Sequence, residues 1–235
     1  MGTTAKTTRK ARKVSASTHL SREERAARTR EQLLNSAARV VGEFGYRDAS
    51  IQRITAHAGM AQGTFYLYFE SRQALFDELL PHFGRDMLEL VRSRAHGASG
   101  FFEIEEIGVR TVFEYLVNNP WFWRVLNEAE VEAPVANAEH RREVTRRYIR
   151  FLQRARAEGE ITAYADSELN VLAYLLIAAR DYLYVHHLAN TKTKKVKSIP
   201  EAAIRTYMTF LRHGLTGAQP ASLPQTVFSQ TIFSK

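Results

Sequence analysis

Residues 50–69 decide the fold, and they read Ser50-Ile-Gln-Arg-Ile54-Thr-Ala-His-Ala58-Gly59-Met-Ala-Gln62-Gly-Thr-Phe65-Tyr-Leu-Tyr-Phe69. Apolar residues at three- and four-residue steps behind Ser50, a good amino-terminal cap, predict a helix over Ile51–Ala58. Gly59 ends this helix, and a second helix is predicted over Gln62–Phe69. Two short helices joined by a tight turn have the outline of a helix-turn-helix unit, which other helical hairpins share.

The second of these helices is predicted to expose a face suited to a DNA groove. Phe65 and Phe69 are large, lie four residues apart and are expected to point inward. On the opposite face, glycine allows close approach, glutamine and threonine can hydrogen-bond bases, and leucine can contact a thymine methyl group. The alternative is that this face packs against a neighbouring helix, and the sequence leaves both open. The face consists of Gln62, Gly63, Thr64, Tyr66 and Leu67.

A longer stretch, from Leu34 to Phe76, carries a family resemblance. Its motifs are Phe44-Gly45-Tyr46, Ile54 followed by Ala58-Gly59, Gly63-Thr-Phe-Tyr-Leu-Tyr-Phe69 and Ser71-Arg-Gln-Ala-Leu75. In combination and spacing they resemble the amino-terminal DNA-binding domain of TetR-type (tetracycline-repressor-like) transcriptional regulators. The resemblance implies an all-α homodimer with a three-helix DNA-binding domain, a connecting helix, and a larger helical domain that binds a small molecule.

The resemblance also assigns roles in DNA binding. It makes 51–58 the supporting helix and 62–69 the recognition helix. Two positions depart from the family pattern: Ala61 replaces a Ser-type cap, a loss worth ~0.5–2 kcal/mol, and Thr55 replaces alanine, so its hydroxyl is expected to bond back to the helix. The implied contacts to bases or phosphates come from Ser50, Gln52, Arg53, Gln62, Gly63, Thr64, Tyr66, Leu67, Tyr68 and Arg72.

Positive charge is concentrated at the amino terminus. The chain has a net charge of +8, and residues 1–30 hold nine of its cations against two glutamates, a local balance of +7. The recognition helix has no Lys or Arg, so a guanine contact is left to Arg53 or to a basic arm over residues 1–20 that enters the minor groove. Deleting this arm is expected to weaken DNA binding and to reduce its salt dependence by ~0.9 per lost phosphate contact. The alternative is a solvated tail.

The remaining sequence predicts helices almost throughout. Pro81 is expected to bend or restart the helix that Ser71 caps, and Ser198 and Glu201 have the spacing of a capping box. We divide the chain into an arm over 1–20, a DNA-binding domain over 21–70, a helical ligand-binding and dimerisation domain over 71–216 and a tail over 217–235, with a basic linker at 191–197. The other predicted helices cover 22–44, 102–118, 120–130, 137–158, 167–189 and 200–214, with a loop over 96–100.

Composition excludes several classes of protein. With 45% hydrophobic and 25% charged residues the chain can form a core, and without cysteine it forms no disulfide or thiolate metal site. We find no phosphate-binding glycine loop and no zinc-protease or serine-hydrolase motif, and the adjacent His186 and His187 diverge on a helix. We therefore expect no catalytic activity, no metal site and no cofactor. No segment predicts a membrane span or secretory signal, so a cytoplasmic location is expected.

Two carboxy-terminal helices are predicted to form a subunit interface. The helix over 167–189 is apolar on every side around Val171–Ala179, which suggests a core on one side and a partner subunit on the other. The helix over 200–214 offers a second apolar stripe, and by resemblance the two form the four-helix bundle of a dimer. A dimer would place two recognition helices on the half-sites of a palindromic operator.

Aromatic residues crowd the region from Phe101 to Trp123, and ordinary core packing is one explanation for them. As a group they are also expected to line an apolar ligand pocket. Asp181 and its neighbour Arg180 interrupt an apolar stretch, and are expected to pair with nearby groups, to cross a dimer interface or to contact a ligand. The acidic run Glu103–Glu106 is expected to be a solvated face. Our candidate ligand-binding residues are Phe102, Tyr115, Trp121, Trp123, Tyr148, Tyr174 and Arg180.

Three functions are consistent with these patterns. The first is a sequence-specific repressor that a small apolar or aromatic-type ligand releases from its operator. The second is a DNA-binding regulator, either an activator or an architectural protein, without a small-molecule effector. The third is a helical sensor or enzyme whose basic end binds anionic membranes. Changing Gln62, Thr64 and Tyr68 would abolish binding in the first two cases and preserve it in the third.

Overall fold

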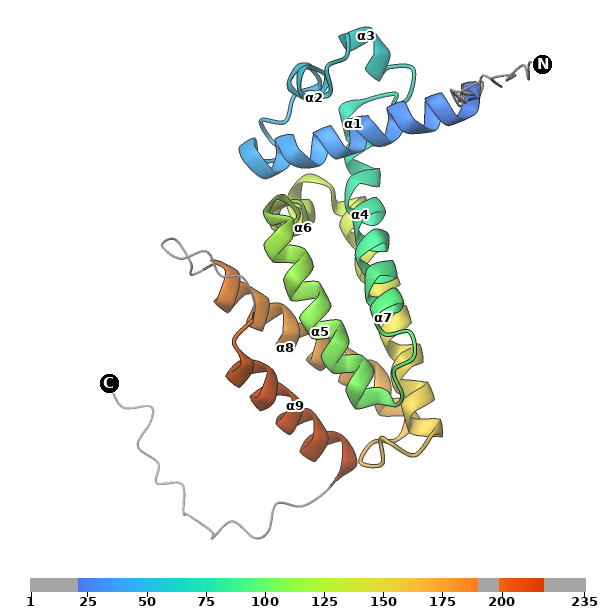
Figure 1. Cartoon of the computed structure of the whole chain (residues 1–235), viewed down its shortest axis with the longest axis vertical. Coiled ribbons are helices and arrows are strands. Elements are labelled where there is room, and N and C mark those ends of the chain that lie inside the picture. Colours follow the sequence, from blue (N-terminus) through green and yellow to red (C-terminus); the bar gives the residue numbers. More distant parts are fainter. Residues whose placement is uncertain (1–20, 190–198, 218–235) are drawn as a thin grey trace, which may run out of the picture.

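A computed structural model of the chain describes residues 21–189 and 199–217, and within these ranges every regular element is helical (Figure 1). The arm over 1–20, the linker over 191–197 and the tail from 218 fall outside the described residues. No helix in the described ranges is long and apolar enough to cross a membrane. The elements are α1 (Arg22–Phe44), α2 (Ile51–Ala58), α3 (Gln62–Phe65), α4 (Arg72–Arg94), α5 (Phe101–Asn118), α6 (Pro120–Glu132), α7 (Pro134–Ala157), the 3-10 helix η1 (Asp166–Glu168), α8 (Leu169–Ala189) and α9 (Glu201–Thr216).

Local capping accounts for the helix ends at the amino-terminal end of the molecule. Gly45 ends α1 with a φ of 83°. The hydroxyl of Ser50 accepts a hydrogen bond from the backbone of Arg53 at 3.2 Å, which caps α2, and Gly59 closes that helix in the left-handed conformation. Ser71 caps α4 in the same way. The sequence predicted each of these ends, because each depends on residues within one turn.

Other helices differ from the predicted bounds. The turn that follows Phe65 replaces the second half of the predicted recognition helix. Pro81 lies within one continuous helix, α4, so the expected restart does not occur. Pro134 stands at the first position of α7, where its missing N–H costs no hydrogen bond, so α7 begins three residues before the predicted start. The helix α9 begins after Pro200, without a side-chain cap, and Ser198 of the predicted capping box lies outside the described residues.

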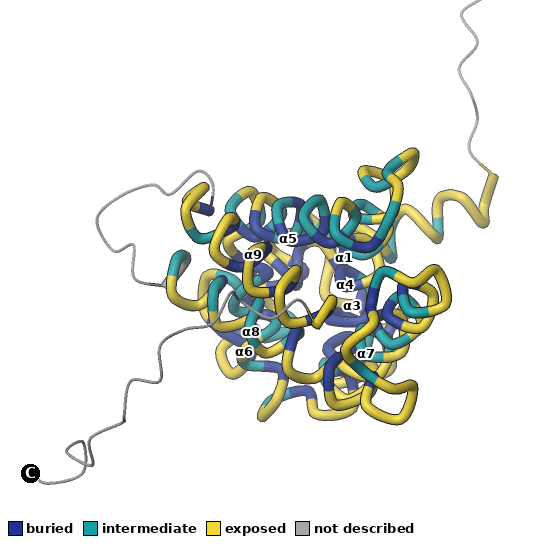
Figure 2. The backbone as a smooth tube through the Cα atoms, turned by 90° about the horizontal axis from the view of Figure 1, so that it is seen from below, coloured by how far each residue is buried: buried dark blue, intermediate teal, exposed yellow. Residues whose placement is uncertain are grey.

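The helices form two connected parts. The first three, α1–α3, lie across one end of the molecule, and α4 runs from them into a larger bundle that contains α5–α9 (Figure 1). Within this bundle α7 packs along α4 and α8 packs on α7. Buried positions line the middle of the bundle and exposed positions its outside (Figure 2).

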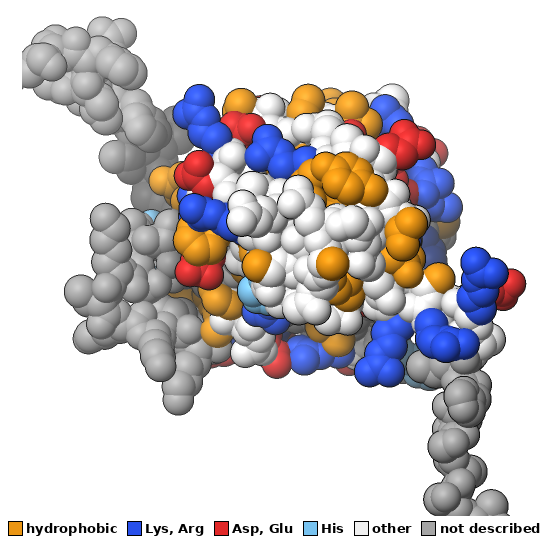
Figure 3. Space-filling view, turned by 90° about the horizontal axis from the view of Figure 1, so that it is seen from above, with side chains coloured by type: hydrophobic (Ala, Val, Ile, Leu, Met, Phe, Trp, Pro, Cys, Tyr) orange, Lys and Arg blue, Asp and Glu red, His pale blue; other side chains and the backbone are white. Residues whose placement is uncertain are grey.

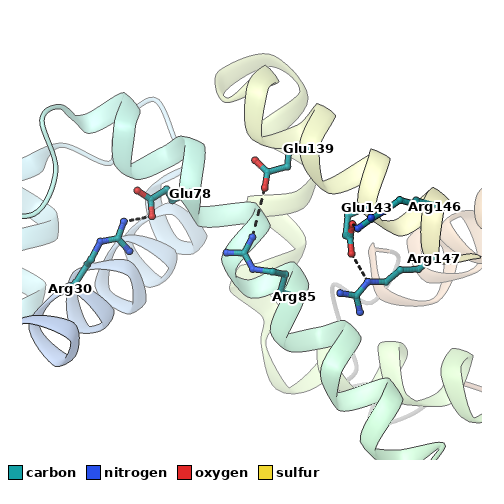
Figure 4. Close-up of polar contacts among 7 residues, drawn as sticks. All are labelled: Arg30, Glu78, Arg85, Glu139, Glu143, Arg146 and Arg147. Carbon is teal, nitrogen blue, oxygen red and sulfur yellow. Dashed lines mark hydrogen bonds and ion pairs between the residues drawn. The ribbon is translucent and has the colours of Figure 1, made fainter. Parts of the chain in front are cut away.

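Ion pairs accompany the packing of α4 against its neighbours. Arg30 of α1 pairs with Glu78 of α4, and Arg85 of α4 lies 3.7 Å from Glu139 of α7 (Figure 4). All four side chains are at least one-third exposed, so each pair contributes little stability. The position of α4 therefore depends on buried apolar residues, among them Leu75, Phe76, Leu79, Leu80 and Phe83.

Candidate functional site

The short helix α3 is held by two buried phenylalanines, as predicted. Phe65 is fully buried and Phe69 is 3% exposed, and their ring centroids lie 5.6 Å apart. After Phe65 the chain forms a turn: Leu67 donates to the carbonyl of Thr64 at 3.2 Å, and the carbonyl of Phe65 accepts from both Tyr68 and Phe69 at 3.0 Å. The predicted two-turn helix is therefore one helical turn followed by a tight turn.

Ala61 occupies the cap position of α3. Its backbone is extended, with φ −69° and ψ 145°, which is suitable for a cap, but no side-chain hydrogen bond caps the helix. The second family departure also behaves as expected, since the hydroxyl of Thr55 donates to the carbonyl of Ile51 at 2.9 Å. Thr55 therefore satisfies its own hydroxyl inside α2.

The face opposite the phenylalanines points to solvent. Gln62 and Gly63 are exposed, Tyr66 is 55% exposed and Leu67 is 79% exposed, while Thr64 is half-buried. The alternative that this face packs against another helix is therefore wrong for the described residues. The end of the molecule that carries this face has mostly uncharged side chains at its centre, and Lys and Arg interspersed with Asp and Glu around its edge (Figure 3).

The other predicted DNA contacts surround this face. Gln52 and Arg53 are exposed on α2, and the Arg53 guanidinium lies 4.3 Å from the centre of the Phe44 ring. Arg72 donates to the carbonyl of Arg47 at 3.1 Å. Ser50 already uses its hydroxyl as the cap of α2. Tyr68 is half-buried beside the exposed turn.

The predicted ligand residues do not gather at one place. Two of them, Tyr148 and Arg180, are in contact: the Arg180 guanidinium lies 4.5 Å from the centre of the Tyr148 ring. Trp121 instead packs against α4 and α1, where its ring meets Phe83 at 4.7 Å. Tyr174 is 56% exposed on the surface of α8. The remaining three are half-buried, with Phe102 beneath Arg212, Tyr115 against Phe122, and Trp123 packed against the core.

Glu105 corrects the prediction of a solvated acidic face. It is 2% exposed, and its carboxylate accepts a hydrogen bond from the hydroxyl of Tyr207 at 2.7 Å. The amino-acid sequence does not reveal this contact, because Tyr207 lies 102 residues away in the chain. The sequence indicates this burial only through helical spacing, since Glu105 lies one turn after the half-buried Phe102 on α5.

The surface hollows contain none of the predicted ligand residues. One hollow is lined by Glu89, Arg92, Ser93 and His96, and another lies between α5 and α9, and neither includes a predicted ligand residue. Among the described residues no group of three His, Asp or Glu side chains is placed to hold a metal ion.

The amino-terminal part of the chain matches a known family. Residues 33–79 fit the family model described as bacterial regulatory proteins, tetR family. The uncharacterized HTH-type transcriptional regulator YvdT of Bacillus subtilis is 37% identical over 83 residues, which are 35% of this chain and 43% of that protein. The chain spans about half the length of the curated relatives it matches.

Solved structures share the fold over most of the chain. The fatty acid degradation regulator FadR from Bacillus halodurans aligns with a TM-score of 0.68 and 20% identity, over 80% of this chain and 96% of that one. FadR from Bacillus subtilis, solved in complex with stearoyl-CoA, aligns with a TM-score of 0.67 and 19% identity, over 78% of this chain and 98% of that one. At these identities the likeness shows the fold alone.

Proposed function

The amino-terminal domain of this chain belongs to the tetR family of bacterial regulatory proteins, and from that premise we propose that the protein is a sequence-specific DNA-binding transcriptional regulator. The observation that carries this proposal is the exposed turn after α3. Leu67 is the most exposed large apolar side chain of the described residues, and it lies beside Gln62 and Gly63 on a face anchored by buried phenylalanines. An isolated apolar side chain on a polar surface is suited to a thymine methyl group.

Selection from random duplex DNA tests this function. The full chain is expected to enrich a consensus, and Gln62→Ala and Leu67→Ala are expected to relax its sequence, since a lost base contact costs about 1–3 kcal/mol. Gln153→Ala, on the exposed surface of α7, serves as a matched control and should leave the consensus unchanged. Enrichment of no sequence, or variants that recover the wild-type consensus, would contradict the proposal.

We propose that the active form is a homodimer that reads a palindromic operator. The support is an apolar stripe on α8 that no described part of the chain covers, made of Val171, Tyr174, Leu175 and Tyr182, each more than half exposed. A stripe of this size on a monomer typically marks an interface. Two copies joined there would carry two α3 turns to half-sites one or more helical turns apart.

We further propose that residues 71–216 bind a small apolar or aromatic-type effector that releases the protein from its operator. The aromatic content of α5–α7 supports such a ligand, and the stearoyl-CoA bound to the FadR structure from Bacillus subtilis suggests acyl compounds as a first class to test. The alternative, a regulator without an effector, is favoured by the surface hollows, which contain none of the predicted ligand residues.

Operator release distinguishes these two alternatives. Bound operator is titrated with acyl-CoA thioesters, fatty acid esters and aromatic compounds, and fluorescence anisotropy of the DNA is followed. Release by one class, at a concentration that leaves the helical content of the protein unchanged, supports the effector. Constant affinity across all classes supports the regulator without one.

A further inference from the structure

Four helices bring one polar cluster into the interior of the larger bundle. It consists of Glu105 from α5, Tyr148 from α7, Arg180 from α8 and Tyr207 from α9. The three residues other than Arg180 are at most 7% exposed, and the Arg180 side chain is 15% exposed. Charged groups are rarely this buried unless they are paired or serve a function.

The cluster is held by one good hydrogen bond and two looser contacts. The hydroxyl of Tyr207 donates to Oε1 of Glu105 at 2.7 Å. Nη1 of Arg180 lies 3.5 Å from the same oxygen, which is longer than a charge-assisted hydrogen bond. The guanidinium of Arg180 also covers the ring of Tyr148 at 4.5 Å.

Two members of the cluster lack hydrogen-bond acceptors. Within the part of the chain that the structure describes, Arg180 donates no side-chain hydrogen bond, although a guanidinium carries five N–H donors. The hydroxyl of Tyr148 is buried close to Glu105 and Tyr207 but makes no well-formed hydrogen bond to either of them. A buried donor without an acceptor is destabilising, and this cluster has more donors than well-placed acceptor atoms.

Charge selects the kind of acceptor. Arg180 and Glu105 contribute one positive and one negative charge, and burial together with the Glu105 carboxylate raises the pKa of Tyr148 well above its ordinary value, so its hydroxyl stays a neutral donor. A second carboxylate would lie beside Glu105 in a poorly solvated interior and would be repelled. An uncharged carbonyl oxygen adds acceptor capacity without adding charge.

We propose that this cluster binds the uncharged carbonyl group of an apolar ligand, such as an ester, thioester or ketone, and that Arg180 and Tyr148 donate to its oxygen. This inference rests on the proposed effector function of residues 71–216 and names the chemistry of the effector. The ring of Phe151 lies 6.1 Å from that of Tyr148 and stacks on Phe101 at 4.7 Å, so aromatic side chains that an apolar ligand can contact lie next to the donors.

The cluster is placed to transmit binding to the proposed dimer interface. Arg180 lies on α8, whose opposite face carries the exposed residues Tyr174 and Leu175. A carbonyl oxygen that hydrogen-bonds to Arg180 replaces part of its attraction to Glu105 of α5. Ligand binding therefore changes the link between α8 and the rest of the bundle.

Matched acid and ester pairs test this chemistry in the full chain without DNA. Free fatty acids and their methyl esters, from about C8 to about C16, are compared by equilibrium dialysis at neutral pH, where the acids are anionic. The ester of at least one pair is expected to bind about tenfold or more tightly than its acid. Arg180→Met should reduce ester affinity by about tenfold or more, and Tyr148→Phe, which keeps the ring, by several-fold.

Glu105→Gln is expected to reverse the preference between ester and acid. Its amide oxygen still accepts from Tyr207, while Arg180 loses its carboxylate neighbour, so this variant is expected to prefer the acid to the ester. Tyr184→Phe is the control, since the Tyr184 hydroxyl makes only a 3.5 Å contact with the Val109 carbonyl, and it should retain the wild-type preference. Circular dichroism and thermal unfolding of each variant confirm that it is folded.

Three results would overturn the inference: equal affinity for acid and ester, unchanged ester affinity in Arg180→Met, or no binding of either ligand. Operator binding by the same preparations separates this failure from failure of the proposed function. Intact operator binding without an ester preference would contradict only the proposed carbonyl site and would leave the proposed regulator function standing. An ester preference in a chain that selects no DNA sequence removes the regulator function and leaves the site.

Discussion

Gly42 of α1 and Trp121 of α6 are in backbone contact: a Cβ atom added to Gly42 would lie 2.2 Å from the Cβ of Trp121 and 2.7 Å from its Cα. Two neighbouring polar contacts join α6 to the end of α1 and to the turn that follows it. Arg124 donates to the carbonyl of Glu43 at 3.0 Å, and Glu128 accepts from the backbone of Tyr46 at 2.9 Å. The α1–α3 end and the larger bundle therefore pack closely where α1 meets α6.

Gly42→Ala is expected to disrupt this joint. The added methyl group meets backbone atoms of α6 that cannot rotate away, so overpacking should lower the free energy of unfolding by about 1–3 kcal/mol. Urea unfolding measures the loss. Gly214→Ala, which has open space on the exposed side of α9, is the control and should stabilise the protein by up to about 1 kcal/mol. Equal stability of wild type and Gly42→Ala would show that α1 and α6 can separate freely.

His140 is expected to make stability depend on pH. Burial, with a smaller effect from Arg141, lowers the pKa of this histidine from 6.5 to about 4. Between pH 6.5 and pH 4 His140 is protonated in the unfolded chain but stays neutral in the folded chain. The free energy of unfolding is therefore unaffected by His140 above pH 6.5 and decreases as the pH falls below this value. At pH 5 the expected loss is about 2 kcal/mol.

Urea unfolding at pH 7.5 and pH 5.0 measures this effect against a variant. His140→Gln cannot gain a proton, so its stability should fall less than that of the wild type over this range. The ring of His140 packs against Gly84 of α4, where an added Cβ would lie 2.3 Å from Nδ1, so the variant is compared only with itself across pH. Identical pH dependence in both proteins would mean that folding does not lower the pKa of His140.

Ala61→Ser is expected to stabilise α3. The extended backbone at Ala61 allows a serine hydroxyl to accept from the backbone N–H of Gly63, for a gain of about 0.5–2 kcal/mol, while the N–H of Thr64 already donates to the carbonyl of residue 61 at 2.9 Å. Hydrogen exchange at the Gly63 amide should slow. Ala61→Val, which offers no acceptor, provides the comparison. Unchanged exchange in Ala61→Ser would show that the length of α3 is set by packing and not by its missing cap.

Leu175→Glu is expected to separate the proposed dimer. Leu175 is 63% exposed in the single chain, so the substitution should preserve the fold while it places a charge in the apolar stripe of α8. Sedimentation velocity should then show a monomer with weakened operator binding. Gln153→Glu, on the exposed surface of α7, should remain dimeric. A dimer that persists in Leu175→Glu would place the interface elsewhere.

The amino-acid sequence by itself determined the local features of this protein. The caps at Ser50 and Ser71, the left-handed Gly59 and the inward phenylalanines Phe65 and Phe69 all depend on residues within a few positions, so helical periodicity and capping chemistry predict them. The back-bonded hydroxyl of Thr55 is predictable for the same reason.

Only the tertiary structure decided which residues meet across helices. Glu105 is buried because Tyr207 and Arg180 reach it from α9 and α8, and Trp121 packs against α4 and α1 instead of joining Tyr148. Helical periodicity shows which face of a helix is apolar, but not which neighbour covers it, because that choice depends on packing among residues far apart in the chain.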